Sequence, residues 1–152
     1  MRKIVMISFA LLLILGSVAF AETDDASITI TIANDDVDWC NFQYPSTGSF
    51  ETNNQFLTYA QVYESGVTDE AGQGADIFAW IGYSETDSDP SGPGWTWVTA
   101  AYHTDNVNND EYVLDLGNTL SSAGTFYVAS RFSRDSLNYS YGGYGGDGGG
   151  FW

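Results

Sequence analysis

The sequence predicts an all-β protein, a two-sheet antiparallel sandwich of about seven strands, similar in shape to immunoglobulin and fibronectin type III domains. Three observations support this prediction. No amphipathic helical stripe of useful length follows the first 21 residues. Short apolar and aromatic runs alternate with clusters of Gly, Pro, Asn and Asp, as strands alternate with turns. Aromatic residues make up 16% of the chain, and so many rings require a packed core.

The strands follow from the alternation of apolar residues between turn signals. Residues 27–33 (SITITIA) alternate strictly, and the Asn34-Asp35-Asp36 cluster then predicts a turn. Pro45 ends the next strand, and Asp87–Gly94 (DSDPSGPG) reads as a rigid loop. In chain order we expect strands at residues 27–33, 37–44, 56–63, 75–83, 95–103, 111–116 and 125–132.

The two ends of the chain differ from this pattern. Residues 1–21 combine Arg2 and Lys3, an apolar run and a small-x-small site, and we expect a signal peptide that is removed on export. The run is too short for a comfortable membrane span, so we expect no membrane insertion after cleavage. Residues 22–137 are then the sandwich domain. Residues 138–152 are rich in Gly and Tyr, and we expect their rings to dock on a sheet.

The charge of the chain limits its partners. The formal net charge is −16, and after loss of the signal peptide only Arg131 and Arg134 balance the 20 Asp and Glu side chains. Nucleic-acid binding depends on Lys and Arg, so DNA and RNA are excluded as expected partners. Neutral polysaccharides, cations and other secreted or cell-surface proteins remain.

A set of short motifs carries a resemblance to a known kind of domain. The motifs are WCNFQYP at 39–45, QVYE at 61–64, WIGY at 80–83, WTWV at 95–98, NNDEY at 108–112, GTFY at 124–127, SRF at 130–132, YGGY at 141–144 and GGGFW at 148–152. Together they resemble a β-sandwich accessory module of large secreted bacterial proteins, often exported by the type IX route alongside glycan-active or nuclease-like enzymes. The resemblance implies a secreted, accessory role. Such modules continue beyond GGGFW into a further strand and a sorting domain, whereas the sequence given ends at Trp152.

Catalysis has little support in the sequence. His103 is the only histidine, no lysine follows the signal peptide, and no nucleophile elbow is present. We therefore expect His103 to be an ordinary surface residue and the protein not to be an enzyme. Cys40 is the only cysteine, and between Trp39 and Phe42 it is expected to be buried.

Calcium is the one cofactor that the sequence suggests. Residues 105–111 (DNVNNDE) contain the densest cluster of oxygen donors, although the EF-hand spacing is absent. A solvated turn explains the same residues. If calcium binds, we expect the ligands to be Asp105, Asn109, Asp110 and Glu111.

Carbohydrate recognition is suggested by tryptophan. Trp95 and Trp97 are two residues apart in an expected strand, so their rings share one face. An outward pair would form a platform for sugar rings, whereas an inward pair would belong to the core, where Trp39 and Trp80 are also expected. The remaining candidate ligand-binding residues are Asp87, Asp89, Tyr144 and Trp152, with Tyr141 beside them.

Two functions therefore stay open. The first is a secreted, non-catalytic module that binds carbohydrate through surface aromatics. The second is a structural or assembly module that pairs with a protein through a sheet edge or the Gly/Tyr tail. Exposed Trp95 and Trp97 would favour the first.

Overall fold

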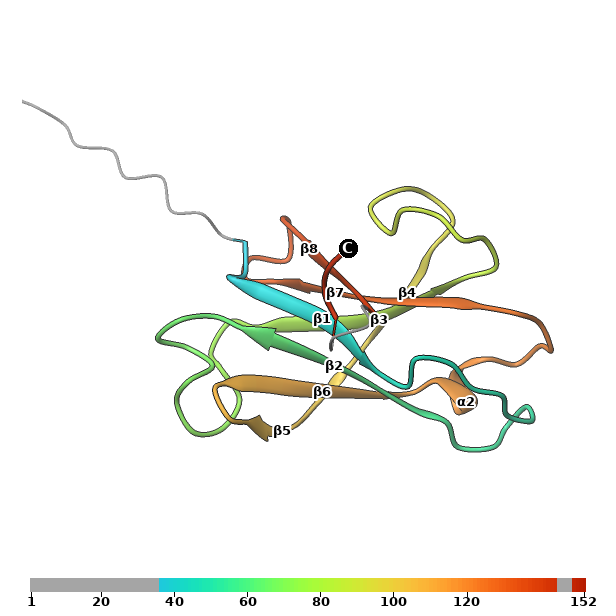
Figure 1. The fold of residues 1–152 in the computed structure, drawn as a ribbon, viewed down its shortest axis with the longest axis horizontal. Helices are drawn as coiled ribbons and strands as arrows, with labels where there is room; N and C mark the ends of the chain where they lie inside the picture. The colour runs from blue at the N-terminus through green and yellow to red at the C-terminus, as the bar shows by residue number, and fades with distance from the viewer. Residues whose placement is uncertain (1–35, 145–148) are drawn as a thin grey trace, which may run out of the picture. The chain divides into compact units, whose positions relative to one another are not determined.

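A computed structural model describes residues 36–144 and 149–152 as two antiparallel sheets, which confirms the predicted β-sandwich class (Figure 1). A single turn of helix, α2 (Leu116–Thr119), follows the sixth strand. The strands are β1 (Trp39–Tyr44), β2 (Leu57–Tyr63), β3 (Phe78–Ser84), β4 (Thr96–Thr99), β5 (Ala101–Asn106), β6 (Asn109–Asp115), β7 (Tyr127–Ser133), β8 (Ser140–Gly143) and β9 (Gly150–Phe151). The expected signal peptide and the expected strand at 27–33 lie outside the described residues. No helix in the described part of the chain is long and apolar enough to cross a membrane.

The strand order is that of an immunoglobulin-like domain. Sheet A has the order β1-β2-β6-β5, and sheet B has the order β4-β3-β7-β8-β9. These orders reproduce the A-B-E-D sheet and the C-F-G strands of immunoglobulin folds, with β4 added beside β3 and β9 added beside β8. β2 pairs with β6 and β3 pairs with β7, and these two pairings join distant parts of the chain, whereas the other pairings join strands that are consecutive in sequence.

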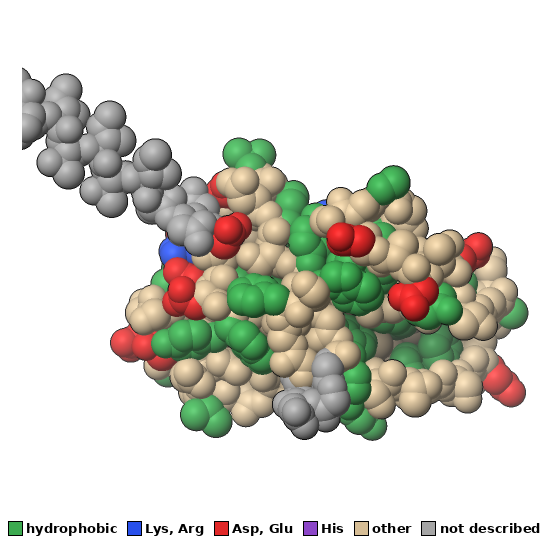
Figure 2. Space-filling view, turned by 45° about the horizontal axis from the view of Figure 1, so that its top comes forward, with side chains coloured by type: hydrophobic (Ala, Val, Ile, Leu, Met, Phe, Trp, Pro, Cys, Tyr) green, Lys and Arg blue, Asp and Glu red, His purple; other side chains and the backbone are tan. Residues whose placement is uncertain are grey.

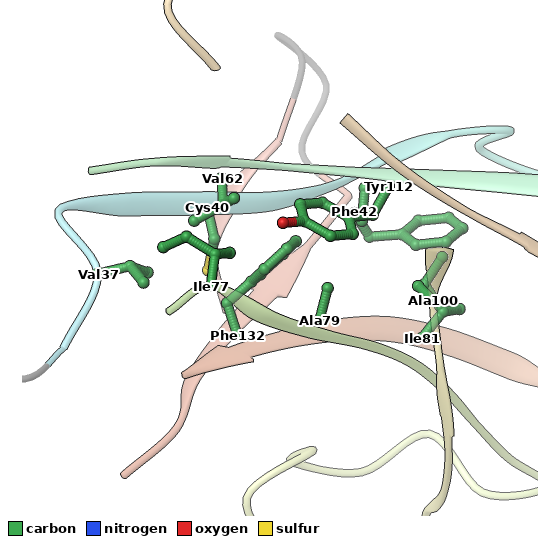
Figure 3. Packing of buried hydrophobic residues seen from close by; sticks show 11 residues of the cluster. Val37, Cys40, Phe42, Val62, Ile77, Ala79, Ile81, Ala100, Tyr112 and Phe132 are labelled. Carbon is green, nitrogen blue, oxygen red and sulfur yellow. The ribbon is translucent and has the colours of Figure 1, made fainter. Parts of the chain in front are cut away.

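The core lies between the sheets and follows the two-residue period of the strands (Figure 3). Sheet A contributes buried side chains such as Phe42 and Val62, and sheet B contributes Ile81 and Phe132. The rings of Tyr112 and Phe132 join the sheets edge to face, with centroids 5.7 Å apart. Cys40 is fully buried as expected, and burial raises the pKa of its thiol to about 12, so it stays protonated.

The prediction of one strand over residues 95–103 is wrong. The chain forms β4 on the edge of sheet B, turns at Ala100 and continues as β5 on the edge of sheet A. Ala100 is buried, and its N–H donates to the carbonyl of Ala79 at 2.9 Å. The switch between sheets arises because β4 pairs with β3 whereas β5 pairs with β6. The local sequence pattern is the same on both sides of Ala100, so it does not reveal the switch.

The Gly/Tyr-rich segment supplies two strands of sheet B. β8 pairs with β7, and β9 pairs with β8. A Cβ on Gly142 would lie 2.5 Å from the Ser130 hydroxyl oxygen and 2.6 Å from the carbonyl carbon of Asn41. The same Ser130 hydroxyl donates to the Asn41 carbonyl at 2.7 Å. Glycine at 142 therefore allows β8 to approach β1, in the other sheet, more closely than any other residue would.

Candidate functional site

The outer face of sheet B is covered by aromatic rings. Cross-strand pairing places Trp80 opposite Arg131, Arg131 opposite Tyr141, and Gly82 opposite Trp97. Their neighbours along the strands, such as Ile81 and Phe132, point into the core, so these side chains point outward. We call this surface the aromatic face. It consists of Phe78, Trp80, Trp95, Trp97, Arg131, Tyr139, Tyr141 and Trp152.

Trp80 therefore corrects one expectation. It was predicted to belong to the core, but it lies half-buried on the outer face, where its ring contacts those of Phe78 and Tyr139. Trp39 is also only half-buried. Both residues alternate with core residues in their strands, Cys40 in β1 and Ala79 in β3, and are thus on the opposite side of their sheets.

Trp95 and Trp97 lie on the same face and stack on each other. Their ring centroids are 5.7 Å apart with an interplanar angle of 21°. A Cβ on Gly82 would come within 2.5 Å of the Trp97 ring, so the missing side chain lets the indole lie against β3. Trp152 meets Trp95 edge to face at 6.1 Å, and the two rings form a corner. Trp152 is 51% exposed, so its ring is the one of the two that is more accessible to a ligand.

Arg131 stands in the middle of the aromatic face. Its guanidinium carbon is 4.2 Å from the ring centroid of Tyr139, 4.7 Å from that of Trp97 and 4.9 Å from that of Trp80. Within the described ranges, the arginine forms no ion pair, and its buried Nε has no hydrogen-bond partner. Cation–π attraction to three rings thus holds this side chain, and the arginine in turn holds the rings apart.

A depression of about 620 Å³ adjoins the aromatic face. Tyr139, Tyr141, Phe151 and Trp152 provide its apolar lining, while its polar lining includes Asp36, Asp38 and Asp89. Figure 2 shows hydrophobic side chains gathered in the middle of one surface, with carboxylates around them and almost no basic groups.

Asp89 is a fixed, charged acceptor at this depression. Its Oδ1 accepts hydrogen bonds from the backbone N–H of Ser91 at 2.9 Å and from the Ser91 hydroxyl at 2.8 Å. These bonds lower the pKa of the Asp89 carboxyl, the backbone bond more than the side-chain bond. The carboxylate can therefore accept hydrogen bonds from a ligand at neutral pH.

Four of the six candidate ligand-binding residues come together here. Asp89 and Trp152 line the depression, Trp95 contacts Trp152, and Trp97 contacts Trp95. Asp87 and Tyr144 are exposed, and neither lines the depression.

Arg131 and Tyr139 were not predicted as site residues, although both belong to this surface. They reach it through the pairing of β7 with β8 and the turn that joins these strands. The Gly/Tyr composition of residues 138–152 was the one available signal.

The four candidate calcium ligands are divided between two sides of sheet A. Asp110 and Glu111 are consecutive in β6 and point in opposite directions. Asp105 and Asp110 face each other across β5 and β6, and both bond to the loop between β2 and β3. Asp105 accepts a hydrogen bond from the N–H of Gly72 at 3.0 Å, and Asp110 accepts one from the N–H of Gly74 at 2.7 Å. On the other side, Asn109 and Glu111 both bond to the side chain of Gln61.

The electrostatics of the two aspartates also differ. A hydrogen bond from the Tyr102 hydroxyl, followed by that from Gly72, lowers the pKa of Asp105. Burial raises the pKa of Asp110, whose Oδ1 is buried without a hydrogen-bond partner among the described residues. Across residues 36–144 and 149–152, no group of three or more His, Cys, Asp or Glu side chains is arranged to hold a metal ion.

Comparison with known proteins gives one informative match. The chain is similar to an amylopullulanase of Thermoanaerobacter thermohydrosulfuricus, with 29% identity over 111 residues. The match covers 62% of this chain and only 7% of the amylopullulanase, so the chain corresponds to a small segment of that relative. No protein-family model and no solved structure matches the chain.

Proposed function

We propose that this protein is an exported, non-catalytic module that binds polysaccharide on the aromatic face of sheet B. The observation that carries the proposal is the pair of rings formed by Trp95 and Trp152, whose centroids are 6.1 Å apart. Trp95 is half-buried and Trp152 is exposed, and the fixed carboxylate of Asp89 lines the same depression as Trp152. The apolar C–H face of a sugar ring stacks on such indoles. Its hydroxyl groups donate to a carboxylate such as Asp89.

The geometry supports a preformed binding surface. The rings are held by one another, by Arg131 and by the contact of Trp97 with Gly82, so little side-chain freedom is lost when a ligand binds. An acidic surface with few basic groups suits a neutral polymer better than a phosphate backbone.

The similarity to amylopullulanase suggests which polymer to test first. By its name, that relative is an enzyme that acts on pullulan, and the chain matches a small part of it. We therefore place pullulan and amylopectin at the head of a panel that also contains xylan and mixed-linkage β-glucan.

Affinity gel electrophoresis tests the proposal. The wild-type domain should be retarded by at least one polymer of the panel, and Trp152→Ala should weaken binding about tenfold, equivalent to about 1.4 kcal/mol. Tyr127→Ala is the matched control, since Tyr127 is an exposed aromatic residue of β7 with no ring contact in the described structure. Equal retardation of wild type and Trp152→Ala would refute binding at this corner.

The alternative is assembly with a protein partner through a sheet edge or the Gly/Tyr tail. Both outer strands of sheet A have a register shift, and the β5 edge also carries Asp105, two features that discourage strand addition. If no polymer retards the domain, assembly becomes the better explanation, and cross-linking in a secreted protein fraction is the next measurement.

A further inference from the structure

We propose a second sugar-binding site on the outer face of sheet A, formed by Gln43, Tyr44, Tyr59, His103 and Glu111. The class of ligand rests on the proposed function, but the residues and the face are different. A depression of about 490 Å³ is lined by these five side chains. Its volume falls within the range of about 300–1,000 Å³ that is usual for small-ligand sites.

Two β-bulges create this site. In β1, Phe42 pairs with Ala60 and Tyr44 with Tyr59, so Gln43 is the extra residue. In β5, Tyr102 pairs with Tyr112 and Thr104 with Glu111, so His103 is the extra residue. β1 and β5 are the two opposite edges of sheet A, and both extra side chains line the same depression.

This coincidence is difficult to explain by folding alone. A bulge bends its strand and redirects one side chain, and bulges are common next to binding and active sites. Here two independent bulges, on strands separated by β2 and β6, direct an amide and an imidazole to one place.

The rings of the site form a tilted wall. The centroid of Tyr59 is 6.5 Å from that of Tyr44 and 5.4 Å from that of His103. Tyr44 is 62% exposed, so one side of the wall is open to a ligand. Tyr44 would stack on the ligand, whereas Tyr59 supports Tyr44 and His103 from between them.

The polar groups of the site are held in place by hydrogen bonds, and one of them is an acceptor that receives no hydrogen bond from any described residue. Glu111 is held at both oxygens, by His103 Nδ1 at 2.8 Å and by Gln61 Nε2 at 3.2 Å. Because Nδ1 of His103 faces the carboxylate, Nε2 is the ring nitrogen that remains available to a ligand. The Oε1 atom of Gln43 is buried and has no hydrogen-bond partner in the described structure.

These groups specify the chemistry of the ligand. The Gln43 amide oxygen beside the Glu111 carboxylate calls for a ligand rich in hydrogen-bond donors, and the exposed Tyr44 ring calls for an apolar surface close to those donors. A neutral pyranose ring has both features. An anionic ligand would meet the carboxylate of Glu111 and is disfavoured. Because sheets A and B face opposite ways, a module with both sites would join two polysaccharide chains.

His103 provides a direct test, because it is the only histidine of the chain. Untagged protein with ¹⁵N-labelled imidazole would be titrated with maltohexaose, xylohexaose and cellohexaose, and the His103 ring signals and tryptophan indole signals followed by NMR. We expect a saturable shift of the His103 signals with at least one oligosaccharide. The shift should persist in Trp152→Ala and be lost in Tyr44→Ala, while Tyr144→Ala serves as the exposed-tyrosine control.

The other outcomes are distinguishable. Movement of the indole signals without the His103 signals would overturn the second site and leave the aromatic-face proposal standing. Loss of the His103 shift in Trp152→Ala would show one shared site and also overturn this inference. If neither set of signals moves with any of the three sugars, both proposals fail.

Discussion

The aromatic face of sheet B and the acidic β5–β6 hairpin of sheet A both contain candidate binding residues that are close together in sequence. The aromatic face brings its candidate residues together in space, whereas the hairpin separates its own. Trp95 and Trp97 are two residues apart and stack at 5.7 Å. Asp110 and Glu111 are adjacent in β6 and point to opposite sides of sheet A. In a strand, a spacing of two builds a surface, whereas a run of consecutive donors is divided between two surfaces.

The strongest way to break the aromatic face is Gly82→Ala. The new Cβ would lie 2.5 Å from the Trp97 ring, so the indole must leave β3. We expect a loss of about 1–3 kcal/mol in the free energy of unfolding, measured by urea denaturation, together with weaker polysaccharide retardation. Gly150→Ala is the control, because its Cβ would meet nothing closer than 3.7 Å. If Trp97→Ala does not relieve the Gly82→Ala defect in the double variant, the clash is not its cause.

Arg131→Met tests whether the arginine holds the rings. Methionine keeps the apolar stem but loses the cation that contacts three rings at 4.2–4.9 Å. We expect a loss of about 1–2 kcal/mol in unfolding free energy and a change in the near-ultraviolet circular dichroism of the tryptophans. Arg131→Lys should recover part of the stability because the positive charge remains. An unchanged spectrum in Arg131→Met would show that the rings hold one another without the arginine.

Asp110→Asn sharpens the other side of the comparison. Burial raises the pKa of Asp110 in the folded state, so the folded protein binds this proton more tightly than the unfolded chain does. The ionised group therefore costs stability at neutral pH, and the cost disappears as pH falls through the raised pKa. An asparagine oxygen can still accept from Gly74, and we expect stability at pH 7 to be equal or up to about 1 kcal/mol higher.

Urea denaturation from pH 8 down to pH 4 measures this effect. The advantage of Asp110→Asn over wild type should shrink towards the acidic end. A variant that is less stable by a constant amount at every pH would show that the carboxylate has a partner which stabilises its charge.

The smallest expected effect is that of calcium. Because Asp105 and Asp110 lie on one side of sheet A and Asn109 and Glu111 bond Gln61 on the other, we expect calcium or EDTA to change the melting temperature by no more than about 1 °C. A larger rise that disappears in Asp105→Asn but survives in Glu111→Gln would place a cation between the two aspartates.

Much of the fold was predictable because it depends on local periodicity. The two-residue alternation located most of the strands, and the clusters of Gly, Pro, Asn and Asp located the turns between them. The switch at Ala100 was not predictable, since the alternation continues through it while the hydrogen-bond partners change from β3 to β6. The outward position of Trp80 was missed because its neighbours in the strand are apolar on both sides.

The sequence by itself determined the β-sandwich class, the shared face of Trp95 and Trp97, and an acidic surface poor in basic groups. These properties follow from strand geometry and composition, which need no knowledge of partners. Only the tertiary structure decided that Arg131 stands among three rings and that Gln43 and His103 line one depression. Such placements depend on register and on bulges, and these arise from pairing between segments far apart in the chain, where many alternatives satisfy the same local pattern.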